Sequence, residues 1–436
     1  MIVAKFGGSS LADATQFRKV KAIIENDSRR QIIVPSAPGK RFEDDDKVTD
    51  LLYRCHREHQ AGEPYENTFE TICGRYLEIA RDLHLSIDMV PYLDEIRRKI
   101  SEGTSADYCA SRGEYLNGLL LADYLGFHFI DAAEVILFDI KGILDSERTN
   151  LLLHERLKSM PDAVIPGFYG SSPDGQIRVF SRGGSDITGA LAARAAQAEL
   201  YENWTDVSGF LMADPRIVHD PSPIRHITYH EMHELSCAGA TVLHEDSVFP
   251  VSRAGIPTNV RNTNMPDHPG TMITCTAVNR ENFSIFAGVA GKKGFSLLFA
   301  EKEVDGYSQA FAQGMLQAVQ ISGLHFQYLP LSASTICLMV NTLKFEEVQD
   351  VLKREISKLG IPYSLTVQHG FAHIVLVGYG IVHNRATVNN IYEAMKKRDI
   401  PIAVINQGSG ELSTWVCVAE NKMEEAIRCL HEQFKS

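Results

Sequence analysis

The first three fifths of the chain alternate strand and helix signals, and this alternation limits the possible folds more than any other feature. Residues 2–6 are an apolar strand candidate, residues 13–25 have helical periodicity, and residues 32–34 form the next strand candidate. Further strands are expected at 127–131, 163–166, 198–204 and 258–260. This pattern predicts an α/β fold with a mostly parallel sheet and helices on both faces, in which ligands bind at the carboxyl ends of the strands.

Two runs with paired glycines fall where such strand ends or helix starts are expected. Lys5-Phe6-Gly7-Gly8-Ser9-Ser10 closes the first strand, and Ser-Arg-Gly-Gly-Ser-Asp at 181–186 opens an alanine-rich helix. Glycines let backbone N–H groups approach an anion, and a neighbouring lysine supplies a fixed positive charge. A Gly-Gly pair after a strand is more often only a tight turn, so the first run alone leaves both interpretations open.

Bulk properties exclude several classes of protein. A chain of 436 residues predicts two or three domains, and a net charge of −12 argues against a nucleic-acid surface. The eight cysteines are scattered without zinc-ligand spacing, which predicts free thiols in a reducing compartment. Met1 leads directly into a strand, and no run reaches the roughly 18 to 20 apolar residues of a membrane span. We therefore expect a cytoplasmic protein without a membrane partner.

The pattern changes after a Pro- and Gly-containing segment at 265–270, and the strand at 271–275 is expected to close the first domain. Beyond it, an order of strand, helix, two strands and helix occurs twice. The expected elements of the first unit are 295–300, 308–323, 326–331, 335–341, 345–359 and a strand at 363–368; those of the second are 374–377, 386–397, 402–405, 414–419 and 422–434. Periodicity leaves a dimerisation module and an effector-binding module as equal alternatives.

Four ordered motifs now resemble those of the monofunctional aspartate kinases, amino acid kinases with two C-terminal ACT domains. They are K-F-G-G-S-S at 5–10, S-R-G-G-S-D at 181–186, T-D-V-S-G at 205–209 and A-D-P-R at 213–216. The resemblance covers nearly the whole chain. It implies an amino acid kinase fold over 1–282 and two ferredoxin-like βαββαβ ACT domains over 283–370 and 371–436, the second of which a strand within 283–291 could complete. No further catalytic domain is expected after them.

The resemblance implies transfer of the γ-phosphoryl group of MgATP to the β-carboxylate of L-aspartate, giving 4-phospho-L-aspartate, the first step of lysine, threonine and methionine biosynthesis. A carboxylate with an ordinary pKa of about 3.9 is already ionised at neutral pH, so this nucleophile needs no general base. Catalysis then depends on alignment and on neutralising the charge of the moving phosphoryl group.

The catalytic residues that the resemblance implies are Lys5 and Asp186. Lys5 would stabilise the transferring phosphoryl group and Asp186 would orient Lys5, while Gly7, Gly8 and Ser9 would donate N–H groups to phosphate oxygens. An acid at a helix start is also a good cap, so Asp186 has a purely structural alternative.

The implied aspartate site combines a planar cation with an acid. Arg182 would hold the α-carboxylate with two hydrogen bonds, and Glu114, in Ser-Arg-Gly-Glu at 111–114, would face the α-ammonium. Ser36, Thr49 and Ser185 are the further implied substrate contacts. The structural alternative makes Glu114 a solvated helix acid, Arg182 a surface residue and Ser185 a cap.

The implied nucleotide site lies in the third and fourth motifs. Thr205 and Asp206 would bind the ribose and base edges of ATP, and Arg216 would reach the phosphates. A turn explains Asp214-Pro215 equally well, so Arg216 carries most of that interpretation. Mg²⁺ would be carried by the ATP phosphates, because the sequence shows no carboxylate cage, and no protein metal ligand is expected.

Two rival functions and several details stay open. The rivals are another amino acid kinase, acting on glutamate, acetylglutamate, carbamate or a nucleotide, and a catalytically idle amino-acid-sensing ACT protein. The effector, whether lysine, threonine or none, is not fixed by the sequence, although Gln327 stands where some relatives have an aspartate that holds a lysine ammonium, which predicts weak or absent inhibition by lysine. Pairing of ACT units between subunits predicts a dimer or tetramer. The acidic insertion at 42–46, between Ser36 and Thr49, has no assigned role.

Overall fold

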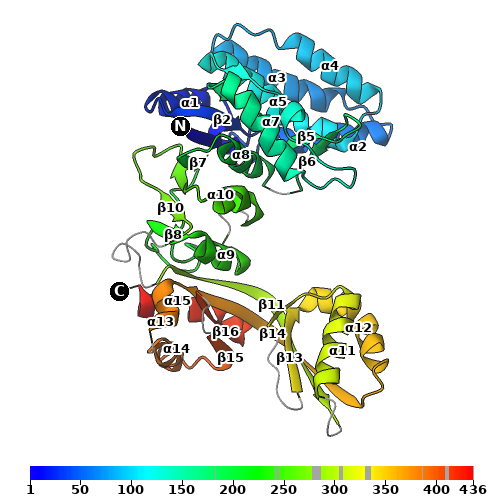
Figure 1. The fold of residues 1–436 in the computed structure, drawn as a ribbon, viewed down its shortest axis with the longest axis vertical. Coiled ribbons are helices and arrows are strands. Elements are labelled where there is room, and N and C mark those ends of the chain that lie inside the picture. Colours follow the sequence, from blue (N-terminus) through cyan, green and yellow to red (C-terminus); the bar gives the residue numbers. More distant parts are fainter. Residues whose placement is uncertain are drawn as a thin grey trace. The chain divides into compact units, whose positions relative to one another are not determined.

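The chain forms two compact units, each described here by itself (Figure 1). The computed structural model describes residues 1–181, 183–240, 243, 245–276, 286–303, 308–328, 335–384, 386–407 and 412–435. Unit 1 consists of Met1–Phe210, Pro223–Ser236 and Thr241–Phe283. Unit 2 consists of Leu211–Ser222, Cys237–Ala240 and Ser284–Ser436.

An eight-stranded sheet forms the centre of unit 1, with the order β3-β4-β2-β1-β7-β9-β10-β8. All pairs from β3 to β9 are parallel, whereas β10 runs antiparallel to β9 and parallel to β8. The mostly parallel α/β sheet predicted from the alternation is thus confirmed. The strands are β1 (Ile2–Phe6), β2 (Arg30–Pro35), β3 (His128–Phe129), β4 (Ala163–Val164), β7 (Leu200–Thr205), β8 (His226–Thr228), β9 (Thr258–Asn262) and β10 (Thr271–Thr274).

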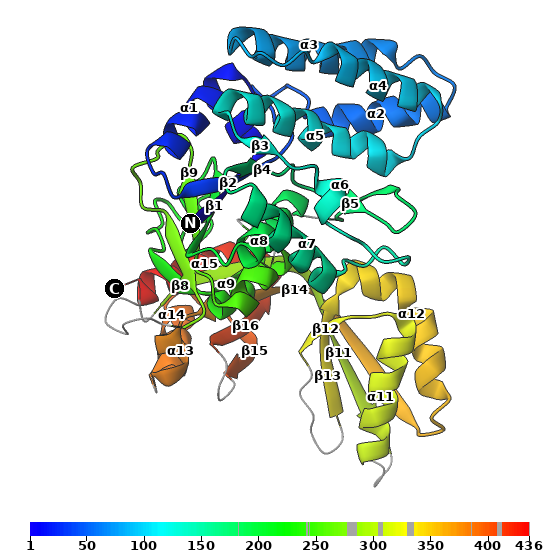
Figure 2. The ribbon, with the colours of Figure 1, turned by 45° about the horizontal axis from the view of Figure 1, so that its top comes forward.

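Helices surround this sheet, and α2, α3, α4 and α5 gather on one side of unit 1 (Figure 2). Their buried faces share one apolar cluster with α1 and with β1. Sequence sets several helix ends: Asp13 accepts the Gln16 N–H at 2.9 Å to begin α1, and Ser105 caps α5 in the same way. The helices are α1 (Ala14–Glu25), α2 (Val48–Gln60), α3 (Glu66–Asp82), α4 (Val90–Ser101), α5 (Ala106–Leu125), α6 (Ala132–Val135), α7 (Ser146–Ser159), α8 (Gly184–Ala195), α9 (Tyr229–Cys237) and α10 (Phe249–Ala254), with the 3₁₀ helices η1 (Gly8–Leu11) and η2 (Glu245–Val248) and the hairpin β5 (Tyr169–Ser171) and β6 (Ile177–Val179).

Unit 2 is built on a six-stranded antiparallel sheet with the order β12-β13-β11-β14-β16-β15. Two apolar clusters lie along it, one under α11 and α12 and the other under α14 and α15. The elements are β11 (Gly288–Lys302), α11 (Ser308–Ser322), β12 (Phe326–Tyr328), β13 (Thr335–Asn341), α12 (Thr342–Ser357), β14 (Tyr363–Val377), α13 (Tyr379–His383), α14 (Thr387–Lys396), β15 (Ile402–Gln407), β16 (Ser413–Ala419), η4 (Glu420–Lys422) and α15 (Met423–Phe434).

The expectation of separate strands at 363–368 and 374–377 was wrong, because the structure has the single 15-residue strand β14 there. Its partner β11 is equally long, and the two pair from Gly288 to Lys302 with register shifts between Lys293 and Leu297. At one half of this pair, β11 also pairs with β13 along Phe295–Glu301. At the other half, β14 also pairs with β16 along Phe371–Val377. The two strand-and-helix modules therefore share one continuous sheet, and the expected division after residue 370 falls inside β14.

The segment Leu211–Ser222 belongs to unit 2, although the expected boundary at 282 assigns it to the first domain. Ala213 and Val218 are buried in the cluster of α14 and α15. Its backbone is also held there, since the Val289 N–H donates to the Met212 carbonyl at 2.7 Å. Hence the A-D-P-R motif is attached to the core of the unit that contains the two strand-and-helix modules.

Among the described residues, no helix combines the length and the apolar character that a bilayer crossing needs.

Candidate active site

Lys5 is held at the carboxyl half of β1 by a buried ion pair. Its Nζ lies 2.7 Å from Oδ1 of Asp186, in the first turn of α8, and the Lys5 side chain is only 10% exposed. Asn203, which pairs with Lys5 in the parallel register of β1 and β7, donates its Nδ2 hydrogen to the same Oδ1 at 2.7 Å. The structure thus brings Lys5 and Asp186 together and adds Asn203, which the sequence analysis missed. A signal was present, because Asn203 is a polar residue inside an expected strand.

The loop after β1 presents backbone N–H groups, but not all of those expected. The Gly7 N–H already donates to the Trp204 carbonyl at 2.9 Å, and the Gly7 carbonyl accepts the Ser10 N–H at 3.0 Å. Gly8 and Ser9 begin η1, where N–H groups have no acceptor within the helix. The N–H groups of Gly8 and Ser9 therefore have no backbone acceptor among the described residues, whereas the Gly7 N–H is already bound.

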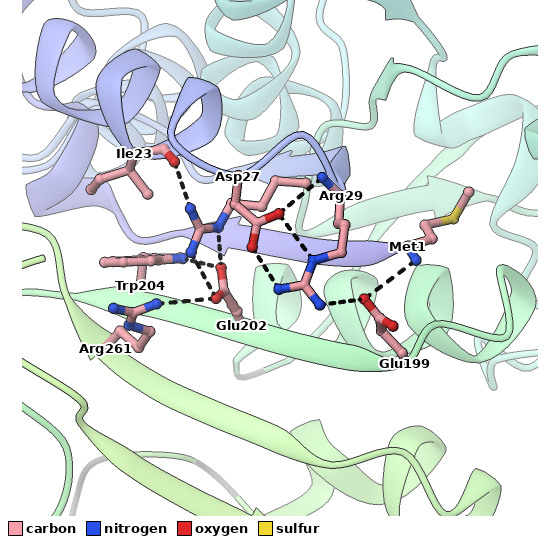
Figure 3. Close-up of polar contacts among 9 residues, drawn as sticks. Met1, Ile23, Asp27, Arg29, Glu199, Glu202, Trp204 and Arg261 are labelled. Atoms are coloured by element: carbon pink, nitrogen blue, oxygen red, sulfur yellow. Dashed lines mark hydrogen bonds and ion pairs between the residues drawn. The ribbon is translucent and has the colours of Figure 1, made fainter. Parts of the chain in front are cut away.

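A buried polar network holds the loop from below (Figure 3). Glu202, which is 2% exposed, accepts hydrogen bonds from Arg30 Nε at 2.7 Å, Arg30 Nη2 at 3.0 Å and Trp204 Nε1 at 2.9 Å. Arg261 Nη1 lies 3.3 Å from Oε1 of the same carboxylate, the oxygen that also accepts from Arg30 Nη2. Because the Trp204 carbonyl holds Gly7, this network fixes the point where β1 becomes the loop.

The loop after β2, residues 36–39, lies against the loop after β1. The Ser36 N–H donates to the Phe6 carbonyl at 3.0 Å, and the Gly39 N–H donates to the Gly8 carbonyl at 2.8 Å. A Cβ on Gly8 would lie 2.8 Å from the Ala37 carbonyl oxygen, so this close approach requires glycine. The two loops therefore form one hydrogen-bonded wall. Ser36 itself is half-buried in it.

Glu114, on α5, faces this wall from inside the protein. The residue is 5% exposed, and its Oε2 has no hydrogen-bond partner among the residues that the structure describes. Burial raises the pKa of Glu114 to about 8, against the opposing effects of the Ala37 N–H and of Arg112 and Lys5. A solvated helix acid is excluded by this burial. An unpartnered buried carboxylate is a good receptor for an ammonium group.

Asn117 follows Glu114 by one helical turn and was not anticipated. Its Nδ2 donates to the Ser36 carbonyl at 2.7 Å, whereas its Oδ1 is buried without a partner. Residues three apart share one face of a helix, so Glu114 and Asn117 point to the same side of α5. This spacing was visible in the sequence, but only the structure shows that the face is buried against the Ser36 loop.

The remaining expected substrate residues are less closely joined. Ser185 is buried in the first turn of α8, where it packs against Gly167, and Thr49 is half-buried in the first turn of α2. Arg182 lies outside the described residues. The structure therefore adds nothing to the expectation that Arg182 holds the α-carboxylate.

The expected nucleotide residues are divided between the units. At the end of β7, Thr205 Oγ1 donates to Asp206 Oδ1 at 3.2 Å, and Asn262 at the end of β9 donates its Nδ2 hydrogen to the Asp206 carbonyl at 3.2 Å. Arg216 belongs to unit 2, is 86% exposed and pairs with Asp214 at 2.6 Å. Among the described residues, no group of three or more His, Cys, Asp or Glu side chains is arranged to hold a metal ion.

Comparison with known proteins decides the family. Residues 1–262, more than half of the chain, match the amino acid kinase family, and residues 374–434 match an ACT domain. Aspartokinase 3 of Bacillus subtilis (strain 168) is 34% identical over 450 residues, covering 100% of this chain and 98% of that protein. This chain belongs to the aspartokinase family. The resemblance inferred from the four motifs is thereby confirmed.

Solved structures agree with this assignment of the aspartokinase fold. The aspartate kinase of Clostridium acetobutylicum is 43% identical and superimposes with a TM-score of 0.92 over 100% of both chains. E. coli aspartokinase III, solved in complex with aspartate and ADP, is 23% identical with a TM-score of 0.77, again over 100% of both chains, and so shares the fold. The predicted order of a kinase domain and ACT domains is confirmed.

Proposed function

We propose that this aspartokinase transfers the γ-phosphoryl group of MgATP to the β-carboxylate of L-aspartate through the site at the carboxyl ends of β1 and β2. The observation that carries the proposal is the pairing of a fixed cation with an unsatisfied buried acid. Lys5 is held by Asp186 beside the free N–H groups of Gly8 and Ser9, and Glu114 keeps an unpartnered oxygen behind the adjoining loop.

The chemistry needs alignment more than proton transfer. A β-carboxylate oxygen attacks the γ-phosphorus, the bond from that phosphorus to the β,γ-bridging oxygen breaks, and ADP departs with the bond electrons. Because the nucleophile is already ionised, no residue has to remove a proton. Lys5 and the loop N–H groups offset the charge that spreads over the phosphoryl oxygens.

Residues around this centre would hold the two substrates. Glu114 and Asn117 would accept hydrogen bonds from the α-ammonium of aspartate, with Arg182 on the α-carboxylate and Ser36, Thr49 and Ser185 nearby. The nucleotide would contact Thr205 and Asp206, and the expectation that Arg216 reaches its phosphates stays a prediction. Mg²⁺ would enter on the ATP phosphates, where it would neutralise phosphate charge.

A coupled assay tests the reaction directly. Release of ADP from MgATP is expected with L-aspartate and not with glutamate, acetylglutamate or carbamate. Trapping the product with hydroxylamine should give a hydroxamate, because an acyl phosphate acylates amines. ADP release without any dependence on aspartate, or a faster reaction with one of the other acceptors, would refute the proposal and favour a rival amino acid kinase. Absence of any ADP release would favour the idle sensor.

Control by an amino acid at the ACT modules is a separate proposal. E. coli aspartokinase III has also been solved in complex with lysine and aspartate, at 23% identity to this chain. The side chain of Gln327 lies outside the part of the chain that the structure describes, so weak or absent lysine inhibition stays a prediction. Titrating lysine and threonine against activity, with the mass recorded by light scattering, tests both the effector and the expected homo-oligomer.

A further inference from the structure

Arg75, on α3, is a buried cation that the proposed chemistry does not use. It is 4% exposed. Its Nη2 donates to the Gly39 carbonyl at 2.6 Å and to the Ala12 carbonyl at 3.2 Å. Its Nη1 donates to the Asp46 carbonyl at 2.8 Å and lies 3.3 Å from Oδ2 of Asp45. One guanidinium therefore binds three separate backbone segments and a carboxylate.

Each of these segments adjoins the candidate site. Ala12 directly follows η1, which begins with the N–H groups of Gly8 and Ser9 in the loop after β1. Gly39 ends the loop that contains Ser36, and Asp46 ends the acidic insertion two residues before α2 begins. Arg75 thus joins the phosphate side of the site, the aspartate side and the insertion between them.

The loop after β2 packs directly against the loop after β1, with no space between their backbones. A Cβ on Gly39 would lie 2.6 Å from the Gly8 carbonyl carbon, so backbone packs directly on backbone. The stem of the insertion is closed by the Val48 N–H, which donates to the Pro38 carbonyl at 3.2 Å. A shift of the Gly39 loop must therefore be passed on to the Gly8 loop.

The acidic insertion supplies the charge that such a buried cation needs. Moving a guanidinium from water into the protein interior is unfavourable unless a nearby anion and hydrogen bonds compensate for the lost hydration. Asp45 supplies the anion and is itself held by Arg41, whose Nε lies 2.9 Å from Oδ2 of Asp45. That hydrogen bond, with the nearby Arg75, keeps the pKa of Asp45 well below its usual range.

We propose that Arg75 is a positioning residue that fixes the loop after β2, residues 36–39, against the loop after β1. We further propose that Arg75 does so through its contacts with the insertion at 42–46. The inference rests on the proposed kinase function, because only a two-substrate reaction needs this alignment. Arg75 touches neither substrate. Its loss should therefore reduce the rate of the bound complex more than it weakens binding.

The first test is Arg75→Lys, which keeps the charge but loses the planar fork that reaches several carbonyls at once. The matched control is Arg81→Lys on the same helix, where the arginine is 72% exposed. We expect kcat to fall by about tenfold or more in Arg75→Lys, with KM for aspartate and ATP within about threefold, and no change in the control. A kcat within about twofold of the parent, or a loss no larger than the loss of folded protein, would overturn the proposal.

The second test uses Asp45→Asn, which leaves Arg75 in place and changes only the insertion. Hydrogen exchange of peptides covering 7–12 and 36–47 should be faster in Asp45→Asn and in Arg75→Lys than in Arg81→Lys. Unchanged exchange in both variants would show that Arg75 and Asp45 do not hold the loops. This measurement needs no catalysis, so it separates a failure of the positioning role of Arg75 from a failure of the kinase function.

Discussion

Two buried glutamates, Glu202 on β7 and Glu114 on α5, show how the same side chain serves two purposes. Glu202 is 2% exposed, and its two oxygens meet Arg30, Arg261 and the Trp204 indole. Glu114 is 5% exposed, yet its Oε2 meets no partner among the described residues, and burial raises its pKa to about 8. Burial is nearly equal, so the number of donors separates the two.

The difference indicates which buried polar groups have all their hydrogen-bond partners within the folded protein and which have capacity left for a ligand. A closed network such as that of Glu202 stabilises one backbone arrangement but has no capacity left to bind anything. An open acid such as Glu114 costs folding free energy in the empty protein, and a cation from outside can recover it. The contrast yields predictions that can each be measured.

Removing Glu202 should give the largest effect, and on stability. Glu202→Ala would leave Arg30 and the Trp204 N–H buried without their acceptor, a loss of about 3–5 kcal/mol for a broken buried pair. The matched control is Glu199→Ala, which removes a 49% exposed acid 3.1 Å from Arg29 and should cost at most about 1 kcal/mol. Denaturation midpoints of the two variants check this; Figure 3 shows Glu202 and Glu199 with their partners. Equal shifts would mean that Glu202 is no more important than a surface pair.

Removing Lys5 should act on turnover instead. Lys5→Ala takes away the cation beside the phosphate loop, so kcat should fall by about 10²- to 10³-fold while the aspartate KM changes by less than about threefold. Lys19→Ala, an exposed lysine on α1, is the control and should be neutral. Steady-state kinetics of both variants decide the matter. A Lys5→Ala enzyme with parental kcat would remove Lys5 from the mechanism.

Removing the charge of Glu114 should act on aspartate binding. Glu114→Gln keeps the size of the side chain but loses the attraction for the α-ammonium, so the aspartate KM should rise by about tenfold or more, about 1.4 kcal/mol or more. The ATP KM should stay the same. Glu134→Gln, at an acid that is 55% exposed, provides the control. A rise in both KM values together would point to general damage instead of a lost ammonium contact.

The sequence allowed the strand β1, the loop after it and the start of α8 to be predicted, because their glycines and apolar residues give strong local signals, whereas the roles of the site residues stay predictions. It could not show which partners Asn117, Asn203 and Arg75 have, since the partners of a polar residue depend on long-range packing. The full length of strands β11 and β14 could not be predicted for the same reason. Glycines at 288, 291 and 294 weaken the strand signal, so the sequence suggested only a possible strand within 283–291 and a separate one at 295–300, and pairing with β14 along the whole length joins them into β11.

The last prediction is a pH dependence that Glu114 confers on the use of aspartate. Its pKa is raised to about 8, so in the free enzyme the carboxyl is mostly protonated at pH 7 and cannot attract an ammonium. We expect kcat/KM for aspartate to rise about tenfold per pH unit from pH 6 to 7 and to level off near 8, because this ratio reports ionisations of the free enzyme. Glu114→Gln should flatten that rise.

Stability should move in the opposite direction over the same range. The folded state retains the Glu114 proton between the ordinary pKa of about 4.3 and the raised value, whereas the unfolded state has lost it, so unfolding becomes easier as pH rises through this window. The Gln variant should lack this contribution in denaturant titrations at pH 6 and 8. A parental enzyme whose kcat/KM for aspartate is flat between pH 6 and 8 would show that Glu114 is ionised in the free site, and the contrast with Glu202 would then lose its electrostatic basis.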